Sequence, residues 1–98
     1  MPTYVTLVKF TSEGLKAVSD IGKRYEEGRK IAEQMGITTT GAYALLGRYD
    51  MMFIYEAPDE IAAAGMPLSF AADGGGQTET WTAIPMADFA KLAVAAKG

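Results

Sequence analysis

The residues best suited to chemistry are tyrosines and carboxylates, because the 98-residue chain contains no histidine and no cysteine. The absence of histidine removes the usual general base near neutral pH and the commonest transition-metal ligand. The absence of cysteine excludes thiolate nucleophiles and disulfides. Proton transfer or ligand binding would therefore depend on tyrosine hydroxyls, carboxylates, lysines and backbone groups.

The sequence Gly47-Arg48-Tyr49-Asp50 lies between two strand-like runs and predicts a tight hairpin at the centre of the domain. Gly47 suits a positive φ, Tyr49 can pack its ring beside the hairpin, and Asp50 can accept hydrogen bonds from neighbouring turn amides. Ordinary turn chemistry therefore accounts for these residues. The alternative is that Arg48, Tyr49 and Asp50 contact a ligand or a neighbouring subunit.

Five aromatic residues fall on different predicted strands, where alternate side chains share one face. They are Tyr4, Tyr43, Phe53, Tyr55 and Trp81. Such a cluster could wall a pocket between sheet and helices and orient a small aromatic or carbonyl compound. Packing in a core or an interface is the commoner role of aromatic residues. The candidate ligand-binding residues are Tyr4, Tyr43, Arg48, Tyr49, Asp50 and Trp81.

Two further sets of residues do not predict a site. The carboxylates of Asp50, Glu56, Asp59 and Glu60 have spacings that fit no calcium loop or other specific pattern of metal ligands, so we expect no metal and no cofactor. The glycine-rich segment Asp73–Gly76 follows a predicted helix, whereas a phosphate-binding loop precedes one. It is typical of helix termination by a left-handed glycine.

Length and charge narrow the class of protein. Residues 1–98 suit one domain, which at this size has little stability to spare and would gain from self-association. The net charge is −3 and the basic residues form no run, so we expect no nucleic-acid partner.

The N-terminus does not resemble a signal peptide, and no run of about 18 apolar residues could span a bilayer. We expect a soluble cytoplasmic protein without a membrane partner.

Four short runs rich in β-branched and aromatic residues predict strands. A helix follows the first of them, with Thr11 or Ser12 as its N-cap and Gly36 at its end. The third run is nearly apolar throughout, as in a strand buried on both faces, whereas the second and fourth carry threonines typical of edge strands. The predicted strands are Pro2–Phe10, Ile37–Leu46, Met51–Ala57 and Gln77–Ile84.

Two more helices are predicted in the second half of the chain. Pro58-Asp59-Glu60 opens the first of these, because proline and carboxylates suit a helix N-terminus. Gly65 and Pro67 should break or kink it before Leu68–Ala72 resumes. A short terminal helix over Met86–Ala96 follows Pro85. Its buried side is predicted to carry Phe89, Leu92 and Ala93.

The order strand, helix, strand, strand, helix, strand predicts an α+β fold of the ferredoxin-like βαββαβ type, a two-layer sandwich with an antiparallel sheet. In this topology the first and third strands are central. Helices cover one face of such a sheet and leave the other open. Apolar residues on both sides of the third strand therefore predict a partner on the open face, most simply a second copy of the chain.

Several segments together resemble the GYD domain family, which is named for its glycine, tyrosine and aspartate. They are Met1–Thr11, Leu46–Asp50, Glu56–Asp59 and Thr78–Thr80, and the likeness covers most of the chain. The resemblance implies a relative of the dimeric α/β-barrel proteins, in which two sheets pack face to face, and implies no established reaction. Gly65-Met66-Pro67 departs from the continuous alanine- and leucine-rich helix expected of the family and affects the adjacent pocket.

Three functions are compatible with the sequence. The first is a small homo-oligomeric binding or regulatory domain with a small-molecule pocket between sheet and helices. The alternative is a cofactor-independent isomerase or oxygenase acting on a small cyclic or aromatic metabolite, with Tyr4, Tyr43 or Asp50 positioning or exchanging protons; this rests on fold analogy. The third is a protein that binds a partner through a threonine-rich edge strand.

Overall fold

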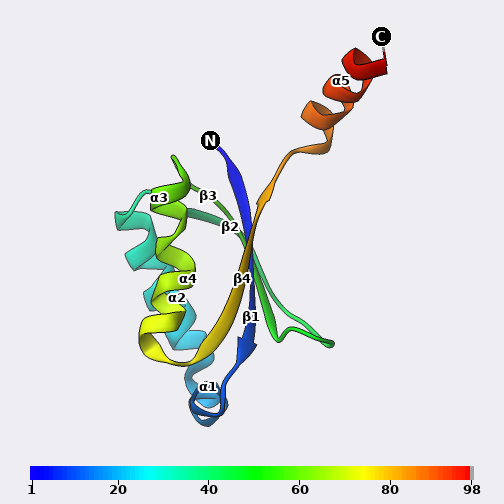
Figure 1. Ribbon diagram of the computed structural model, residues 1–98. Helices are drawn as coiled ribbons and strands as arrows, with labels where there is room; N and C mark the ends of the chain where they lie inside the picture. The colour runs from blue at the N-terminus through cyan, green and yellow to red at the C-terminus, as the bar shows by residue number, and fades with distance from the viewer. Residues whose placement is uncertain (98) are drawn as a thin grey trace.

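The computed structural model describes residues 1–97 and contains a four-stranded antiparallel sheet with helices on one face (Figure 1). The strands are β1 (Thr3–Phe10), β2 (Thr38–Ala44), β3 (Met51–Glu56) and β4 (Gly76–Ala83). The helices are α1 (Ser12–Lys16), the 3-10 turn η1 (Val18–Asp20), α2 (Ile21–Gln34), α3 (Glu60–Ala63), α4 (Gly65–Asp73) and α5 (Met86–Lys97).

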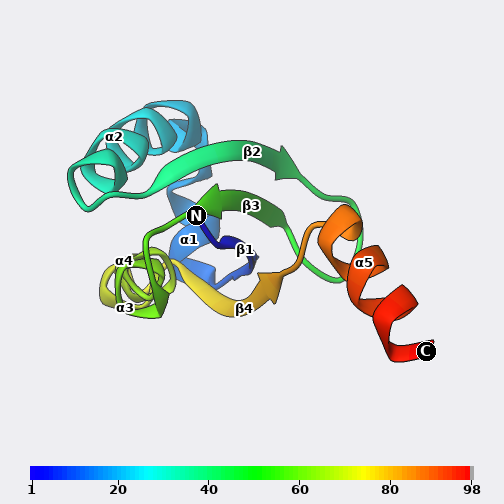
Figure 2. The ribbon, with the colours of Figure 1, turned by 90° about the horizontal axis from the view of Figure 1, so that it is seen from above.

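The strand order is β2-β3-β1-β4, and every neighbouring pair is antiparallel. The predicted ferredoxin-like order, with central first and third strands and threonine-rich edges, is therefore confirmed. The sheet is twisted, and α2, α3 and α4 all lie on the same side of it (Figure 2).

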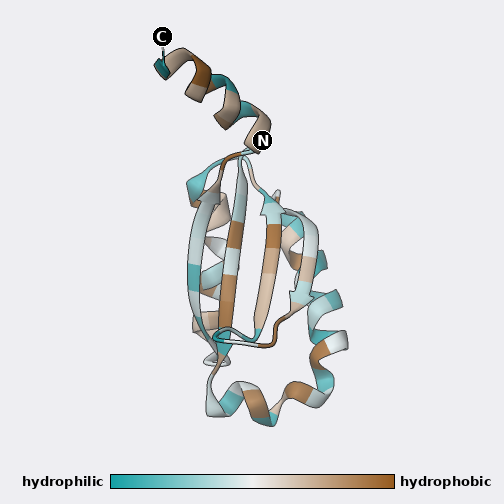
Figure 3. Cartoon of the chain, turned by 90° about the vertical axis from the view of Figure 1, so that its right-hand side faces the viewer, coloured by the Kyte–Doolittle hydropathy of each residue, from teal (hydrophilic) through white to brown (hydrophobic). Residues whose placement is uncertain are grey.

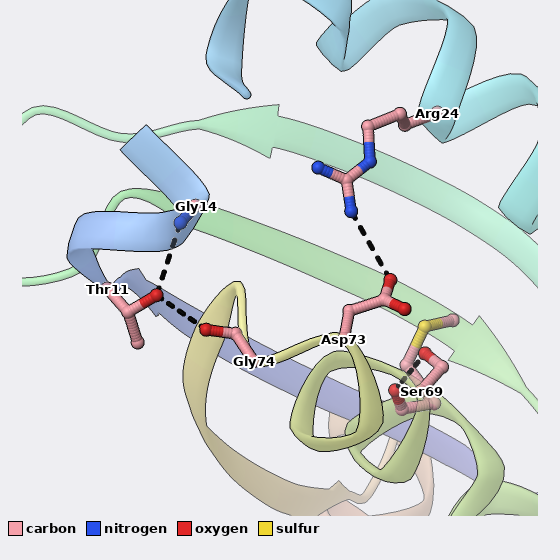
Figure 4. Close-up of polar contacts among 7 residues, drawn as sticks. Thr11, Gly14, Arg24, Ser69, Asp73 and Gly74 are labelled. Carbon is pink, nitrogen blue, oxygen red and sulfur yellow. Dashed lines mark hydrogen bonds and ion pairs between the residues drawn. The ribbon is translucent and has the colours of Figure 1, made fainter. Parts of the chain in front are cut away.

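The helix predicted to run unbroken to Gly36 is instead divided into α1, η1 and α2. Thr11 caps α1, since its hydroxyl accepts a hydrogen bond from the Gly14 amide at 3.2 Å and donates one to the Gly74 carbonyl at 2.6 Å (Figure 4). The Thr11 amide also donates to the Gly75 carbonyl at 3.2 Å. These contacts tie the first helical turn to the start of β4. A side chain at position 14 would clash with the Gly75 carbonyl.

The predicted interruption of the second long helix is confirmed and lies at Ala64, between α3 and α4. Asp59 caps α3, because its carboxylate accepts a hydrogen bond from the Ala62 amide at 2.9 Å. Pro67 lies in the first turn of α4, where a missing N–H removes no helical hydrogen bond. The helix ends at Gly74, which has a φ of +71°, so the predicted left-handed glycine termination is also confirmed.

The core fills the space between the sheet and its helices. Alternate β1 side chains, Tyr4, Thr6 and Val8, point into it and are buried. Thr6 is the centre of a polar chain, since its hydroxyl is 2.8 Å from the Tyr55 hydroxyl and 2.9 Å from the Thr80 hydroxyl. The Tyr55 hydroxyl also lies 3.3 Å from the Ala63 carbonyl in α3, to which it donates. The buried polar groups are thus satisfied.

Helix α5 stands away from the rest of the molecule, beyond the end of β4 (Figure 1). The prediction that Phe89, Leu92 and Ala93 form a buried side is wrong for the single chain, because no described residue of α5 is buried. Phe89 is 51% exposed and Leu92 is 63% exposed. The hydrophobic periodicity is present, but this chain leaves the apolar side of α5 exposed.

Candidate functional site

The Gly47–Asp50 segment lies in a loop of residues 45–50, longer than the tight turn that the sequence predicts. Asp50 fixes this loop to the central strand. Its carboxylate accepts a hydrogen bond from the Phe10 amide at 2.8 Å, and its own amide donates to the Val8 carbonyl at 2.8 Å. The expectation that Asp50 binds turn amides is therefore corrected, because its side chain satisfies the end of β1.

Tyr49 reaches from the loop to the far edge of the sheet. Its hydroxyl donates a hydrogen bond to the Glu79 carboxylate on β4, so the ring does not simply lie beside the hairpin as predicted. That hydrogen bond raises the pKa of Tyr49, and desolvation adds to the effect. Lys9 on β1 donates to the Arg48 carbonyl at 3.2 Å. Lys9, Arg48, Tyr49 and Glu79 border a small exposed depression at this corner of the sheet.

The five aromatic residues are divided between the two faces of the sheet. Tyr4, Phe53 and Tyr55 point toward the helices, and the Tyr4 and Tyr55 rings stack with centroids 5.8 Å apart. Tyr43 and Trp81 lie on the open face, on the two edge strands, and are 57% and 53% exposed. A single pocket walled by all five is therefore excluded.

A groove of 720 Å³ lies on the helical side of the sheet, between α2, α4 and β2. Its aromatic floor contains Phe53, which stacks with Tyr25 at 6.2 Å and with Phe70 at 5.6 Å between ring centroids. An ion pair between Arg24 on α2 and Asp73 on α4, with 3.3 Å between nitrogen and oxygen, crosses from one helix to the other (Figure 4). The groove has a volume typical of small-molecule sites.

Sequence reasoning placed a pocket between sheet and helices but missed the residues that line it. Of the six candidate residues, only Tyr43 borders this groove, at its rim on β2, although its ring lies on the open face. The available signal was the glycines Gly22 and Gly28 on α2, which line the groove and carry no side chain that could fill it.

On the open face, the hydrophobic residues are concentrated on the central strands β1 and β3, whereas the edge strands are more polar (Figure 3). Trp81 is paired with Val5, and Val5 with Ile54, in one row across the sheet. In the next row Leu7 is paired with Glu79 on one side and with Met52 on the other, and Met52 is paired with Tyr43. Since directly paired residues share a face, the six apolar side chains in these two rows form one surface, called the open-face band below.

The acid and base candidates do not converge. Tyr4 and Tyr43 lie on opposite faces of the sheet, and the Asp50 carboxylate is engaged with the Phe10 amide. Among residues 1–97, no three acidic side chains lie close enough together to hold a metal ion. In the same part of the chain, no helix has both the length and the apolar character needed to cross a membrane.

Comparison with known proteins agrees with the fold and with the signature at the hairpin. Residues 4–93 match the GYD domain. A protein of Thermus thermophilus named "Glutamine synthetase and cystathionine beta-lyase binding protein" is 33% identical over 89 residues, which cover 90% of this chain and 94% of that protein. No solved structure matches the chain significantly. The chain belongs to the GYD domain family.

Proposed function

We propose that this protein is a small homo-oligomeric binding domain that docks onto a metabolic enzyme and regulates it. The observation that carries this proposal is the likeness, over nearly the whole chain, to a relative named for binding glutamine synthetase and cystathionine beta-lyase. The lack of convergent acid and base residues fits a binding role better than a catalytic one.

Binding to the two enzymes named for the relative is the first test. The chain is immobilised, and purified glutamine synthetase and cystathionine beta-lyase from its own source are passed over it while binding is followed by biolayer interferometry. Saturable binding of either enzyme, with a change in that enzyme's turnover, supports the proposal. If neither enzyme binds, the enzyme-docking role is wrong.

Self-association through the open-face band is the second part of the proposal. Tyr43 and Trp81 are more than half exposed, and a contiguous apolar surface of this kind marks an interaction site. Ile54→Lys places a charge in the middle of the band and should convert the oligomer to a monomer. Gln34→Lys adds the same charge at an exposed position on α2 and serves as the control. Size-exclusion chromatography with light scattering measures both variants; a monomeric wild-type protein contradicts this part.

The groove between α2 and α4 is the proposed small-molecule site, favoured by its aromatic floor and its volume. The probe is 8-anilinonaphthalene-1-sulfonate, whose fluorescence rises in apolar surroundings. Gly28 lines the groove, and a Cβ atom added there meets no other atom within 4 Å, so Gly28→Trp can place a large ring in the groove without a clash at the backbone. We expect saturable fluorescence in the wild type and in Gly28→Ala, and its loss in Gly28→Trp. Equal fluorescence in all three proteins would place the probe elsewhere.

A further inference from the structure

Helix α5 lacks the packing that a helix of its length requires. It contains 12 residues, and an isolated helix of about 12 to 15 residues is marginal in water, because tertiary packing supplies most helical stability in proteins. None of its described residues is buried. The body of its own chain therefore supplies little of the packing that would stabilise this helix.

The largest apolar side chains of α5 lie on one stripe. Phe89, Leu92 and Ala93 are spaced by three and four positions, and Met86 and Ala96 continue the same face by a turn in each direction. The opposite side carries Lys91 together with Ala87, Val94 and Ala95, and Asp88 lies on the flank. Helix α5 therefore presents its only aromatic residue and its only leucine on the same face.

The direction of α5 limits which surface can cover that face. Seen along the sheet, α5 lies beyond the end of β4 on the side away from α2 and α4 (Figures 1 and 2). Its own α2–α4 groove is on the other side of the sheet. A second sheet placed on the open-face band would stand on the side toward which α5 projects.

We propose that α5 is an arm that packs its apolar stripe, Met86, Phe89, Leu92, Ala93 and Ala96, on a second copy of this chain held against the open-face band. This inference rests on the proposed self-association and names the helix that stabilises the dimer. Each protomer packs its α5 on the other protomer.

The area of the interface supports this occupant. Strand spacing and rise give four strands of six to eight residues a footprint of roughly 460 Å². A stable interface buries about 800 Å² on each partner, so the sheet alone falls short. A helix of this length, about 18 Å by 10 Å, adds roughly 180 Å² from each protomer, and the corrugation of side chains increases both contributions.

Hydrogen exchange of the α5 amides at increasing protein concentration tests the arm directly. If a second copy covers α5, these amides gain protection over the same concentration range in which light scattering detects the dimer. Protection that is independent of concentration would mean that the chain covers its own arm and would overturn the proposal. Free exchange in an established dimer would overturn it too.

Two substitutions at matched exposed positions complete the experiment. Phe89→Lys interrupts the stripe and should raise the dimer dissociation constant at least about tenfold, as expected for an aromatic anchor. Val94→Lys makes the same kind of change outside the stripe and should leave that constant unchanged. If the wild type dimerises and Phe89→Lys does so equally well, the proposed role of α5 in the dimer is wrong, but the proposed self-association is not contradicted. If the wild type is a monomer at every concentration, the proposed self-association fails as well.

Discussion

The two faces of the sheet have similar apolar content and different surroundings. On the covered face, Tyr4, Val8 and Tyr55 are buried against α2, α3 and α4. The open-face band ends in the half-exposed rings of Tyr43 and Trp81. Strand β3 supplies both faces from adjacent residues. The difference teaches that the apolar side chains of the covered face are buried by the helices of the same chain, while on the open face the rings of Tyr43 and Trp81 stay half-exposed.

Adjacent β3 residues give the largest expected contrast. Phe53→Ala removes a buried ring that stacks with Tyr25 and Phe70, and should lower the free energy of unfolding by about 3 to 5 kcal/mol. Ile54→Ala, on the open face, should lower it by only about 1 kcal/mol in dilute solution. Urea unfolding at low protein concentration measures both. Equal losses would erase the distinction between the faces.

Asp50 is expected to give the next largest effect, because it joins the loop to the covered sheet. Asp50→Ala leaves the Phe10 amide without its charged acceptor and should cost about 2 kcal/mol in unfolding free energy. Asp50→Asn keeps an oxygen acceptor in place and should cost less. Thermal unfolding at neutral pH compares the two; an alanine variant as stable as the wild type would show that this hydrogen bond does not hold the loop.

The buried polar chain on the covered face should contribute less. Thr6→Val keeps the shape of the side chain but removes the hydroxyl that meets Tyr55 and Thr80, at a cost of about 1 kcal/mol. Thr82→Val changes an exposed threonine on β4 and should be within about 0.5 kcal/mol of the wild type. Chemical denaturation measures both. A similar loss of unfolding free energy at the two positions would show that the hydrogen bonds among Thr6, Tyr55 and Thr80 do not stabilise the fold.

The smallest expected effect is a loss of stability at alkaline pH, and this loss does not occur at neutral pH. Burial raises the pKa of Tyr55 above its ordinary value of about 10, despite opposing hydrogen bonds with Thr6 and Thr80. The unfolded chain therefore ionises first, so stability is complete below about pH 10 and falls as the pH rises through the folded-state pKa. Melting temperatures above pH 10 should fall less steeply in Tyr55→Phe. Tyr49→Phe, at an exposed site, should follow the wild type closely.

Most of the fold could be predicted from the sequence, because strand composition and helix-ending residues are local signals. The central position of β1 and β3, the interruption near Gly65 and the end at Gly74 all depend on such signals. The outward direction of α5 could not be predicted, since periodicity shows which side of a helix is apolar and not which molecule covers it. The partner of Asp50 lies 40 positions away, at Phe10, and is decided by tertiary structure.

The division of the aromatic residues depends on one irregularity in β2. Thr39 is paired with Tyr55, which points toward the helices, but a bulge shifts the register so that Gly41 is paired with Ile54 on the open face. A bulge inserts one residue and exchanges the faces of those that follow. Tyr43 therefore faces outward although simple alternation from Thr39 would direct it to the helices. The local signal of this shift is Gly41, because a glycine inside a strand often marks a bulge.

The hydrogen bond between the Asp50 carboxylate and the Phe10 amide bears on how function is inferred within this family. An aspartate at this position can accept a hydrogen bond from the last amide of the central strand β1, whatever the protein binds. Relatives that share the glycine, tyrosine and aspartate would then share the fold, while their binding partners could differ. Two GYD proteins that bind different enzymes should accordingly differ in sequence in the open-face band and in α5. The Gly-Arg-Tyr-Asp hairpin should stay the same in both.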